Sequence, residues 1–421
     1  MDRLKIGKGH PGVRVCTTRQ NQARSTASIK ASKVNGNQPR NSHITLPEVS
    51  MAATNTTDRR QALQAFDDTK AGVKGLVDAG VIIVPPIFHH PPDSLPTSSS
   101  SVTIPVIDLF ASRSDVLAQV KAAAETVGFF QVVNHGVPAV LLAETLASVR
   151  RFHESPPESK APYYTRDLAK KLRFNSNFDL FQSPAANWRD TLFCQALPDP
   201  PGEDELPPAV RGVLPAYSGA ARRLAVAVLE LLSEALGLAP GRLAEMGCAD
   251  GVVVVGNYYP PCPEPRRTLG TSRHSDPAFL TVLLQDYDMP GLQVLVGGEE
   301  EEEDGRRRAW ADVPPVAGAL VINVGDLLQL VSNGRLRSVE HRVVANGSRD
   351  GRARVSVAAF CNADLSARTA AREYGPIEEL VSSSSAPALY RSVTVPEFLS
   401  HYDDKGLDGR PALDYFRLPR P

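Results

Sequence analysis

Two histidines and one aspartate are the residues of this chain whose types and spacing could hold a metal ion. His274 and Asp276 stand two positions apart, and His341 follows in a later stretch. In a β-strand, a spacing of two places both side chains on the same face. Two imidazoles and one carboxylate are the ligand set that holds Fe(II) on one face and leaves the opposite positions open. The three residues therefore predict a non-haem iron site of the oxygenase type.

A His-X-Asp triplet alone is a weak signal, because buried histidines are often hydrogen-bonded within an ordinary core. The surrounding stretches, 279–284 and 339–344, are rich in β-branched and apolar residues and read as strands. Arg354 and Ser356 share one face of a further strand-like run, 353–360, and a strand-borne arginine is a bidentate clamp for a carboxylate. A metal-ligand set followed by such a clamp favours a functional site over chance.

Further motifs carry a family resemblance. Residues 257–263 (NYYPPCP), taken with the metal-type and clamp residues, resemble the plant branch of the iron(II)/2-oxoglutarate-dependent dioxygenases. Residues 65–78 (AFDDTKAGVKGLVD) are similar to the homologues of 1-aminocyclopropane-1-carboxylate oxidase, a branch that includes the dioxygenase acting on benzoxazinoid glucosides in grasses. The likeness runs from about residue 60 to the C-terminus. One departure is Ser275, where many relatives have threonine, and we expect this side chain to point away from the metal.

The resemblance implies a β-rich α+β fold, in which a double-stranded β-helix, or jelly-roll barrel, is buttressed by N-terminal helices. It implies Fe(II) and the co-substrate 2-oxoglutarate, whose far carboxylate needs the cation of Arg354 and the hydroxyl of Ser356. Asn257 and Tyr259 match the family's Asn-X-Tyr motif at the same bound acid, although a tyrosine beside two prolines also suits a core. Ascorbate is a further candidate, as a reductant.

Three functions stay open at this point. The first is a 2-oxoglutarate-dependent dioxygenase that hydroxylates, desaturates or demethylates a small plant metabolite and releases succinate and carbon dioxide. The second is an ascorbate-dependent oxidase of the 1-aminocyclopropane-1-carboxylate type, against which Pro277 and Phe279 after the ligand pair argue. The third is a non-catalytic metabolite-binding relative, against which the intact ligand set argues.

Composition limits the partners and the compartment. The net charge of −1 gives no electrostatic reason to expect nucleic acid or an anionic membrane surface. Five cysteines without a Cys-X-X-Cys spacing favour a reducing compartment, and no apolar run is long enough for a transmembrane helix. We expect a cytoplasmic monomer that binds dioxygen and a small-molecule substrate.

The chain divides into five segments by composition and pattern. The first is basic, rich in Ser, Thr and Asn, and reads as a disordered extension or a plastid transit peptide. The others are a helix with a linker, a region of helices and strands, the jelly-roll core, and a C-terminal segment with a helix. The boundaries are 1–50, 58–102, 103–245, 250–365 and 366–421.

Local patterns give four further expectations. Residues 58–79 read as one amphipathic helix, and a helical region beginning at residue 139 continues to residue 171. A C-terminal helix that begins at residue 395 and continues to Tyr402 and Phe416 is expected to cover the mouth of the site. The charge run 299–308 reads as a solvated hairpin loop. Four aromatic residues are candidates for either core or substrate-pocket wall: Phe178, Phe181, Trp188 and Phe360.

Overall fold

A computed structural model describes the chain over residues 56–95, 102–297, 308–366, 369–384 and 387–419. Residues 51–421 form one compact unit. The expectation for residues 1–50 lies outside the described residues and stays a prediction. The same holds for most of the charge run 299–308, whose flanking strands pair as an antiparallel hairpin.

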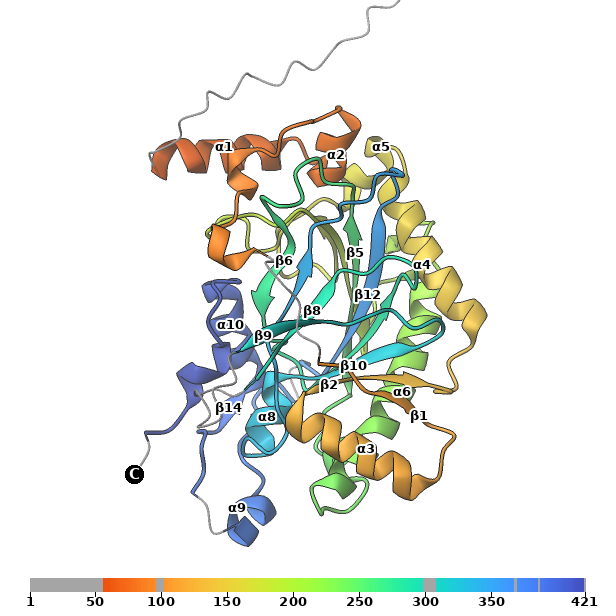
Figure 1. Cartoon of the computed structure of the whole chain (residues 1–421), viewed down its shortest axis with the longest axis vertical. Coiled ribbons are helices and arrows are strands. Elements are labelled where there is room, and N and C mark those ends of the chain that lie inside the picture. The colour runs from red at the N-terminus through yellow and green to blue at the C-terminus, as the bar shows by residue number, and fades with distance from the viewer. Residues whose placement is uncertain (1–55, 96–101, 298–307, 367–368, 385–386, 420–421) are drawn as a thin grey trace, which may run out of the picture. The chain divides into compact units, whose positions relative to one another are not determined.

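Two sheets form the centre of the compact unit (Figure 1). The larger has, in spatial order, β1 (Val106–Asp108), β2 (Phe129–Val133), β10 (Leu320–Val324), β7 (Leu280–Gln285), β12 (Arg354–Asn362), β5 (Gly251–Tyr259), β4 (Asp190–Leu197) and β3 (Leu172–Asn175). The smaller has β6 (Leu269–His274), β11 (His341–Val344), β8 (Leu292–Val296) and β9 (Ala309–Asp312). Apart from the parallel pair β1–β2, neighbouring strands run antiparallel.

Apolar side chains from both sheets pack together between them. Phe129 and Val321 of the larger sheet share one buried cluster with Leu292, Val294 and Val343 of the smaller sheet. Two sheets joined by such a layer are the architecture of a jelly roll. The β-rich jelly-roll fold expected from the sequence is confirmed.

Helices cover the outer face of the larger sheet, as expected. They are α3 (Arg113–Thr126), α4 (Ala139–Glu154) and α6 (Val213–Ala235), and Figure 1 shows α4 and α6 along one side of β5 and β12. Leu224 and Val228 of α6 lie in the same buried cluster as Val254 of β5. Gly256 lets α4 approach the sheet, because a Cβ there would lie 2.9 Å from Val149 Cγ1.

The single helix expected over 58–79 is wrong, since the segment forms α1 (Thr56–Asp68) and α2 (Gly72–Asp78). Gly72 has a φ of +66°, and a Cβ there would lie 2.3 Å from Asp190 Oδ1. The carboxylate of Asp190 accepts hydrogen bonds at 2.7 and 2.8 Å from two backbone N–H groups in the first turn of α2. A side chain from β4 therefore starts a new helix where the local pattern continues the old one.

The helical region expected to reach residue 171 is also shorter than predicted. Helix α4 ends at Glu154, and Pro156 and Pro157 follow after its C-cap Ser155. Proline disfavours helical conformation in the residue before it and lacks the N–H that a helix interior needs. Only the four-residue α5 (Pro157–Lys160) and one 3-10 turn remain helical before β3.

The C-terminal segment contains the expected helix, α10 (Val395–Lys405), whose N-cap Thr394 accepts a hydrogen bond from Glu397 N at 3.2 Å. The helix ends at Lys405, before Phe416, which lies in a separate 3-10 turn. The remaining elements are α7 (Arg242–Glu245), α8 (Asp326–Val331), α9 (Glu378–Ser384), β13 (Glu373–Tyr374) and β14 (Val393–Thr394). Short 3-10 turns span Pro86–Phe88, Pro92–Ser94, Ala161–Tyr163, Glu203–Glu205 and Ala412–Phe416.

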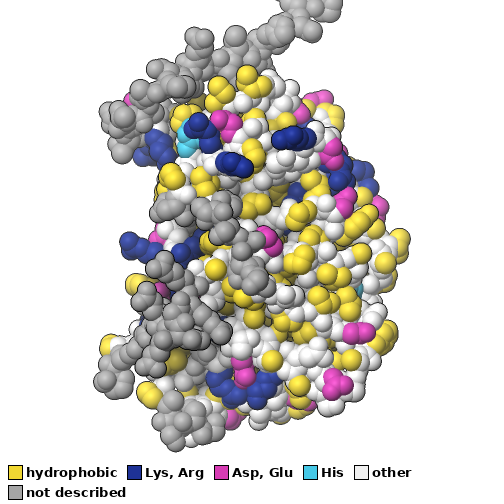
Figure 2. All heavy atoms as spheres, viewed as in Figure 1, with side chains coloured by type: hydrophobic (Ala, Val, Ile, Leu, Met, Phe, Trp, Pro, Cys, Tyr) yellow, Lys and Arg dark blue, Asp and Glu magenta, His cyan; other side chains and the backbone are white. Residues whose placement is uncertain are grey.

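Charged side chains of both signs are scattered among hydrophobic ones on the face shown in Figure 2. This mixture agrees with the formal net charge of −1. Within the described part of the chain, none of the helices has the length and apolar character that crossing a membrane requires.

Candidate metal centre and active site

Strands β6 and β11 bring the three predicted metal ligands together. His274 is the last residue of β6, His341 is the first of β11, and the two are paired directly across the smaller sheet. Asp276 lies two residues beyond β6. Its Oδ1 is 3.7 Å from His274 Nε2 and 3.5 Å from His341 Nε2, and the possible ligand atoms all lie within 4.8 Å of one another. The structure therefore places all three side chains at one point.

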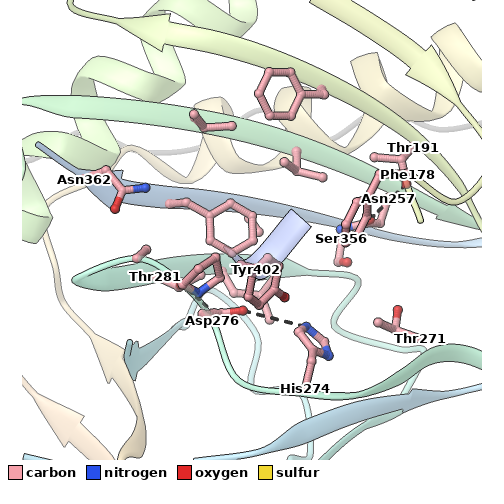
Figure 3. Close-up of a pocket in the computed structure, with 18 of the residues that line it drawn as sticks. Phe178, Thr191, Asn257, Thr271, His274, Asp276, Thr281, Ser356, Asn362 and Tyr402 are labelled. Carbon is pink, nitrogen blue, oxygen red and sulfur yellow. Dashed lines mark hydrogen bonds and ion pairs between the residues drawn. The ribbon is translucent and has the colours of Figure 1, made fainter. Parts of the chain in front are cut away.

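The expectation that His274 and Asp276 share one strand face is wrong. Strand β6 ends at His274, so Ser275 and Asp276 lie outside it, and the Ser275 hydroxyl donates to Asp326 Oδ2 at 2.9 Å. Figure 3 shows the Asp276 carboxylate pointing back toward the His274 ring. The pair converges because the chain leaves the strand after His274, and residues 280–284 of the expected run belong to β7 in the other sheet.

Two side chains that the sequence analysis did not single out hold the Asp276 carboxylate. Thr281 Oγ1 donates to Asp276 Oδ2 at 2.6 Å, and Asn323 Nδ2 donates to the same oxygen. Thr281 on β7 and Asn323 on β10 are register partners. One carboxylate oxygen is thus fixed by the larger sheet, and the other faces the two imidazoles.

The two histidines present unprotonated nitrogens to the centre. Nδ1 of His274 lies 2.8 Å from the carbonyl oxygen of Ser272, and Nδ1 of His341 lies 3.3 Å from that of Val339. Each Nδ1 therefore carries the proton that the carbonyl accepts, which leaves the Nε2 lone pair for a metal. Burial, reinforced by the neighbouring His341, lowers the pKa of His274 to about 3. A neutral imidazole at pH 7 is the form that binds a metal.

Strands β12 and β5 place the predicted carboxylate clamp in the same cavity. Arg354 pairs with Tyr259 and Ser356 pairs with Asn257 in the β12–β5 register. All four side chains line a cavity of about 380 Å³ that the three ligand-type residues also line. Figure 3 shows Ser356 and Asn257 projecting from neighbouring strands of the larger sheet, across the cavity from His274.

Hydrogen bonds hold the Arg354 guanidinium at Nε and Nη2, and within the described part of the chain its Nη1 has no partner. It is 2% exposed, Nε donates to Met289 O at 3.1 Å, and Nη2 donates to Gln285 Oε1 at 2.8 Å. Its buried Nη1 has no hydrogen-bond partner among the described residues. An unsatisfied buried donor costs about 1–3 kcal/mol, more when it is charged. This donor, with Ser356 on the same face of β12, fits the far carboxylate of 2-oxoglutarate.

Asn257 and Tyr259 take part in a polar network at one end of the cavity. Asn257 Oδ1 accepts from Thr191 Oγ1 and from Arg189 Nη1, both at 3.4 Å, and Tyr259 Oη lies 3.3 Å from Thr271 Oγ1. Arg189 and Thr271 also line the cavity, and the sequence analysis missed both. No local sequence signal marks Arg189, because it stands one residue before β4, and β4 reaches the cavity through its pairing with β5, a segment far away in the chain.

The aromatic wall candidates divide into two groups. Phe178 and Phe360 line the cavity. Trp188 is fully buried in a separate hydrophobic cluster, and Phe181 stacks on the guanidinium of Arg166 at 5.5 Å instead. Two of the four candidates therefore belong to the wall.

Helix α10 closes part of the cavity, as expected of the C-terminal segment. Its residues Leu399, Tyr402 and Asp403 line the cavity, and Figure 3 shows Tyr402 close to Asp276. Burial raises the pKa of Asp403 to about 6. A helix from the end of the chain thus borders a site whose other residues come from the barrel.

Comparisons with known proteins agree with this geometry. The 2OG-Fe(II) oxygenase superfamily matches residues 251–363, and the non-haem dioxygenase in morphine synthesis N-terminal family matches residues 104–211. The 1-aminocyclopropane-1-carboxylate oxidase homolog 1 of Arabidopsis thaliana is 46% identical over 381 residues, which are 88% of this chain and 100% of that protein. The chain belongs to the 2OG-Fe(II) oxygenase superfamily. Homolog 3 from the same plant is 48% identical to this oxygenase, over 86% of this chain and 97% of its own.

Solved structures of other dioxygenases share the fold of this oxygenase. The crystal structure of JOX2 in complex with 2OG, Fe and JA has a TM-score of 0.71 and 29% identity, covering 83% of this chain and 98% of that one. The dioxygenase for auxin oxidation in rice has a TM-score of 0.58 and 27% identity, covering 75% and 100%. As a member of its superfamily, the protein is a dioxygenase that uses Fe(II) and 2-oxoglutarate.

Proposed function

We propose that His274, Asp276 and His341 are the Fe(II) ligands of this dioxygenase, and that Arg354 and Ser356 anchor the far carboxylate of 2-oxoglutarate. The observation that carries the proposal is the convergence of three ligand-type atoms within 4.8 Å in a cavity that is also lined by Arg354, whose buried Nη1 has no partner among the residues that the structure describes. A metal-ligand set at one side and a buried cation at the other suit an acid that reaches from one to the other.

Iron and 2-oxoglutarate together supply the oxidising chemistry, in which dioxygen converts the keto acid to succinate and carbon dioxide and gives its second oxygen atom to the substrate. The side chains bind and orient. Thr281 and Asn323 fix the Asp276 carboxylate, and the carbonyls behind both histidines fix their tautomers. Tyr259 and Asn257, beside Arg354 and Ser356 in the sheet, extend the polar end that receives the co-substrate.

We propose that the substrate is a small, largely apolar plant metabolite and that hydroxylation is the default outcome. Desaturation or demethylation requires only a different placement of the substrate carbon. A cavity of about 380 Å³ is in the range for small-molecule sites. Its apolar wall is formed by side chains from the larger sheet, the β3–β4 connection and α10: Phe178, Phe193, Val253, Val255, Phe360 and Leu399. The relatives from Arabidopsis thaliana support a plant origin, and we propose a place in plant specialised metabolism.

The wider context is proposed on composition and chain organisation. We propose a cytoplasmic monomer without nucleic-acid or membrane partners, supported by the mixed surface charge in Figure 2 and the net charge of −1. The proposed domain division keeps 1–50 as an extension or a plastid transit peptide, 58–102 and 103–245 as the N-terminal part, 250–365 as the jelly-roll core, and 366–421 as the C-terminal part. Mass spectrometry of the mature chain from plant tissue tests the N-terminal part of this division.

The decisive test of the reaction is succinate release coupled to substrate oxidation. Iron-loaded protein is incubated with 2-oxoglutarate and a plant metabolite extract, and products that gain one oxygen are sought by mass spectrometry. His274→Ala and Asp276→Ala should abolish both signals, whereas His135→Ala, at the turn after β2, should retain them. Ethylene production from 1-aminocyclopropane-1-carboxylate with ascorbate and without 2-oxoglutarate would contradict the proposal.

A further inference from the structure

A second buried guanidinium, Arg189, faces the cavity. Its side chain is 8% exposed and stands directly before β4. Nη1 donates to Thr271 Oγ1 at 3.1 Å and to Asn257 Oδ1 at 3.4 Å, and both acceptors are uncharged. Its buried Nε has no hydrogen-bond partner among the described residues. None of the carboxylates in that part of the chain forms an ion pair with it. Arg189 therefore keeps a buried positive charge with unused donors.

Such a group needs a counter-ion. A charge buried without a partner is strongly unfavourable, because the surroundings replace neither its hydration nor its hydrogen bonds. Structural arginines of this chain show the contrast: Arg166 pairs with Asp67, and Arg150 pairs with Asp286. An arginine fork matches a carboxylate with two parallel hydrogen bonds. The unmatched fork of Arg189 is thus suited to an anion that arrives from the cavity.

Arg189 belongs to the same row of inward side chains as the 2-oxoglutarate clamp. Arg354 pairs with Tyr259, and Asp190 pairs with Tyr258, so Arg189 continues the row one strand beyond Tyr259. Two strand spacings, roughly 10 Å, separate the backbones of the two arginines. Burial favours a raised pKa for Tyr259, but the charges of Arg189 and Arg354, together with hydrogen bonds from Thr271 and Ser356, outweigh it and lower that pKa. Two distinct cationic positions therefore flank one tyrosine.

The surroundings of Arg189 connect it with both the metal centre and the apolar wall. Its hydrogen-bond partner Thr271 lies on β6, the strand that ends at His274. Along β4, the side chains of Thr191 and Phe193 line the same cavity at alternate positions after Arg189. A ligand with its charge at Arg189 would extend an apolar body along this strand, beside the site proposed for iron.

We propose that Arg189 binds a carboxylate of the oxidised substrate, so that the enzyme acts on small amphipathic acids. This inference rests on the proposed function, in which Arg354 is already engaged by 2-oxoglutarate. The competing interpretation is that Arg189 is a second residue that binds the carboxylate of 2-oxoglutarate. It is less favoured because Arg354 Nη1 and Ser356 already offer donors on one strand for that single carboxylate.

The test uses matched acids and amides on the full-length enzyme. The probes are phenylacetate, 3-phenylpropionate and 4-phenylbutyrate, each beside its primary amide. Binding to protein loaded with Fe(II) and 2-oxoglutarate without oxygen is followed by thermal shift and by visible absorption of the metal centre. Wild-type protein should bind at least one acid about tenfold or more tightly than its amide, as a charge-assisted hydrogen bond implies. Arg189→Met should remove this preference, and Arg189→Lys should keep part of it.

A parallel titration with 2-oxoglutarate separates the two readings. Arg189→Met should bind 2-oxoglutarate within about twofold of wild type, whereas Arg354→Met should bind it about tenfold or more weakly. If Arg189→Met weakens 2-oxoglutarate as much as Arg354→Met does, or if wild type never prefers an acid over its amide, the inference is overturned. The thermal midpoint of each variant reports folding, and Arg189→Lys answers the question if Arg189→Met fails to fold. A wild-type enzyme that shows no 2-oxoglutarate-dependent absorption would overturn the proposed function itself.

Discussion

His274 and His341 are register partners across β6 and β11, and their ring centroids lie 4.2 Å apart. Paired residues on antiparallel strands project from the same face of a sheet. The register between two short strands therefore positions both imidazoles, and it shifts directly after His341. Asp276, two residues after the end of β6, completes the set and is held by donors in the other sheet. The candidate metal centre thus depends on both sheets of the barrel.

The two donors behind Asp276 should tune metal affinity. Thr281→Val or Asn323→Ala removes one hydrogen bond from Asp276 Oδ2 and leaves the carboxylate less firmly oriented. We expect Fe(II) affinity to fall about 10- to 100-fold, measured by anaerobic metal titration. Thr281→Ser keeps the hydroxyl and should stay close to wild type. Unchanged affinity in Thr281→Val would show that this bond does not orient the carboxylate.

Ser356→Ala should weaken 2-oxoglutarate while leaving the metal unaffected. The change removes one hydroxyl beside the Arg354 clamp, and a single hydrogen bond contributes about 1 kcal/mol, or roughly fivefold in affinity. The measurements are the KM for 2-oxoglutarate and the Fe(II) dissociation constant. Ser366→Ala, in an exposed loop, is the matched control. A change in iron affinity with no change in KM would place Ser356 in a different role.

Phe360→Ala should reduce substrate binding without reducing co-substrate binding. Phe360 lines the cavity, so its truncation removes apolar contact worth about 1–3 kcal/mol. Phe181→Ala is the matched control, because it truncates a phenylalanine that does not line the cavity. The readout is substrate-stimulated turnover of 2-oxoglutarate over a range of substrate concentrations. Equal effects of the two substitutions would contradict the assignment of the wall.

His153 should make stability depend on pH. The ring is fully buried, and Nε2 lies 3.3 Å from Gly256 O. Burial, with the charge of Lys160, lowers its pKa from 6.5 to about 3. Because the unfolded chain takes up a proton first, the stabilising contribution of neutral His153 is present above pH 6.5. It is lost as the pH falls toward 3, at up to about 1.4 kcal/mol per pH unit.

His153→Phe removes this titration and keeps a ring against Phe174 and Tyr258. The free energy of unfolding of the variant should therefore fall less steeply than that of wild type between pH 6.5 and 4. Urea unfolding at several pH values measures both slopes. Parallel slopes would mean that His153 does not titrate differently in the two states.

The site residues predicted from local motifs lie together in the structure. The site residues that the sequence analysis missed are positioned by strand pairing between segments far apart in the chain. The β-branched runs around His341 and Arg354 predict their strands, because β-propensity and alternation are local properties. Thr281 and Asn323 become neighbours only through the β7–β10 register. Arg189 joins the cavity only through the β4–β5 pairing, which a single sequence does not encode in any local pattern.

The break between α1 and α2 illustrates the same limit. The apolar periodicity of residues 58–79 favours one helix, but Asp190, 117 residues from Val73, caps a second one. Tertiary contacts of this kind override local propensity. By contrast, the early end of α4 could have been predicted from Pro156 and Pro157, which follow its C-cap Ser155.

The most direct measurement is a crystal structure of the enzyme grown without oxygen in the presence of Fe(II) and 2-oxoglutarate. The account predicts an anomalous iron peak at bonding distance from Nε2 of His274, Nε2 of His341 and Oδ1 of Asp276, with the far carboxylate of 2-oxoglutarate on Arg354. Iron bound elsewhere, or a 2-oxoglutarate molecule that leaves the Arg354 guanidinium without a partner, would contradict it.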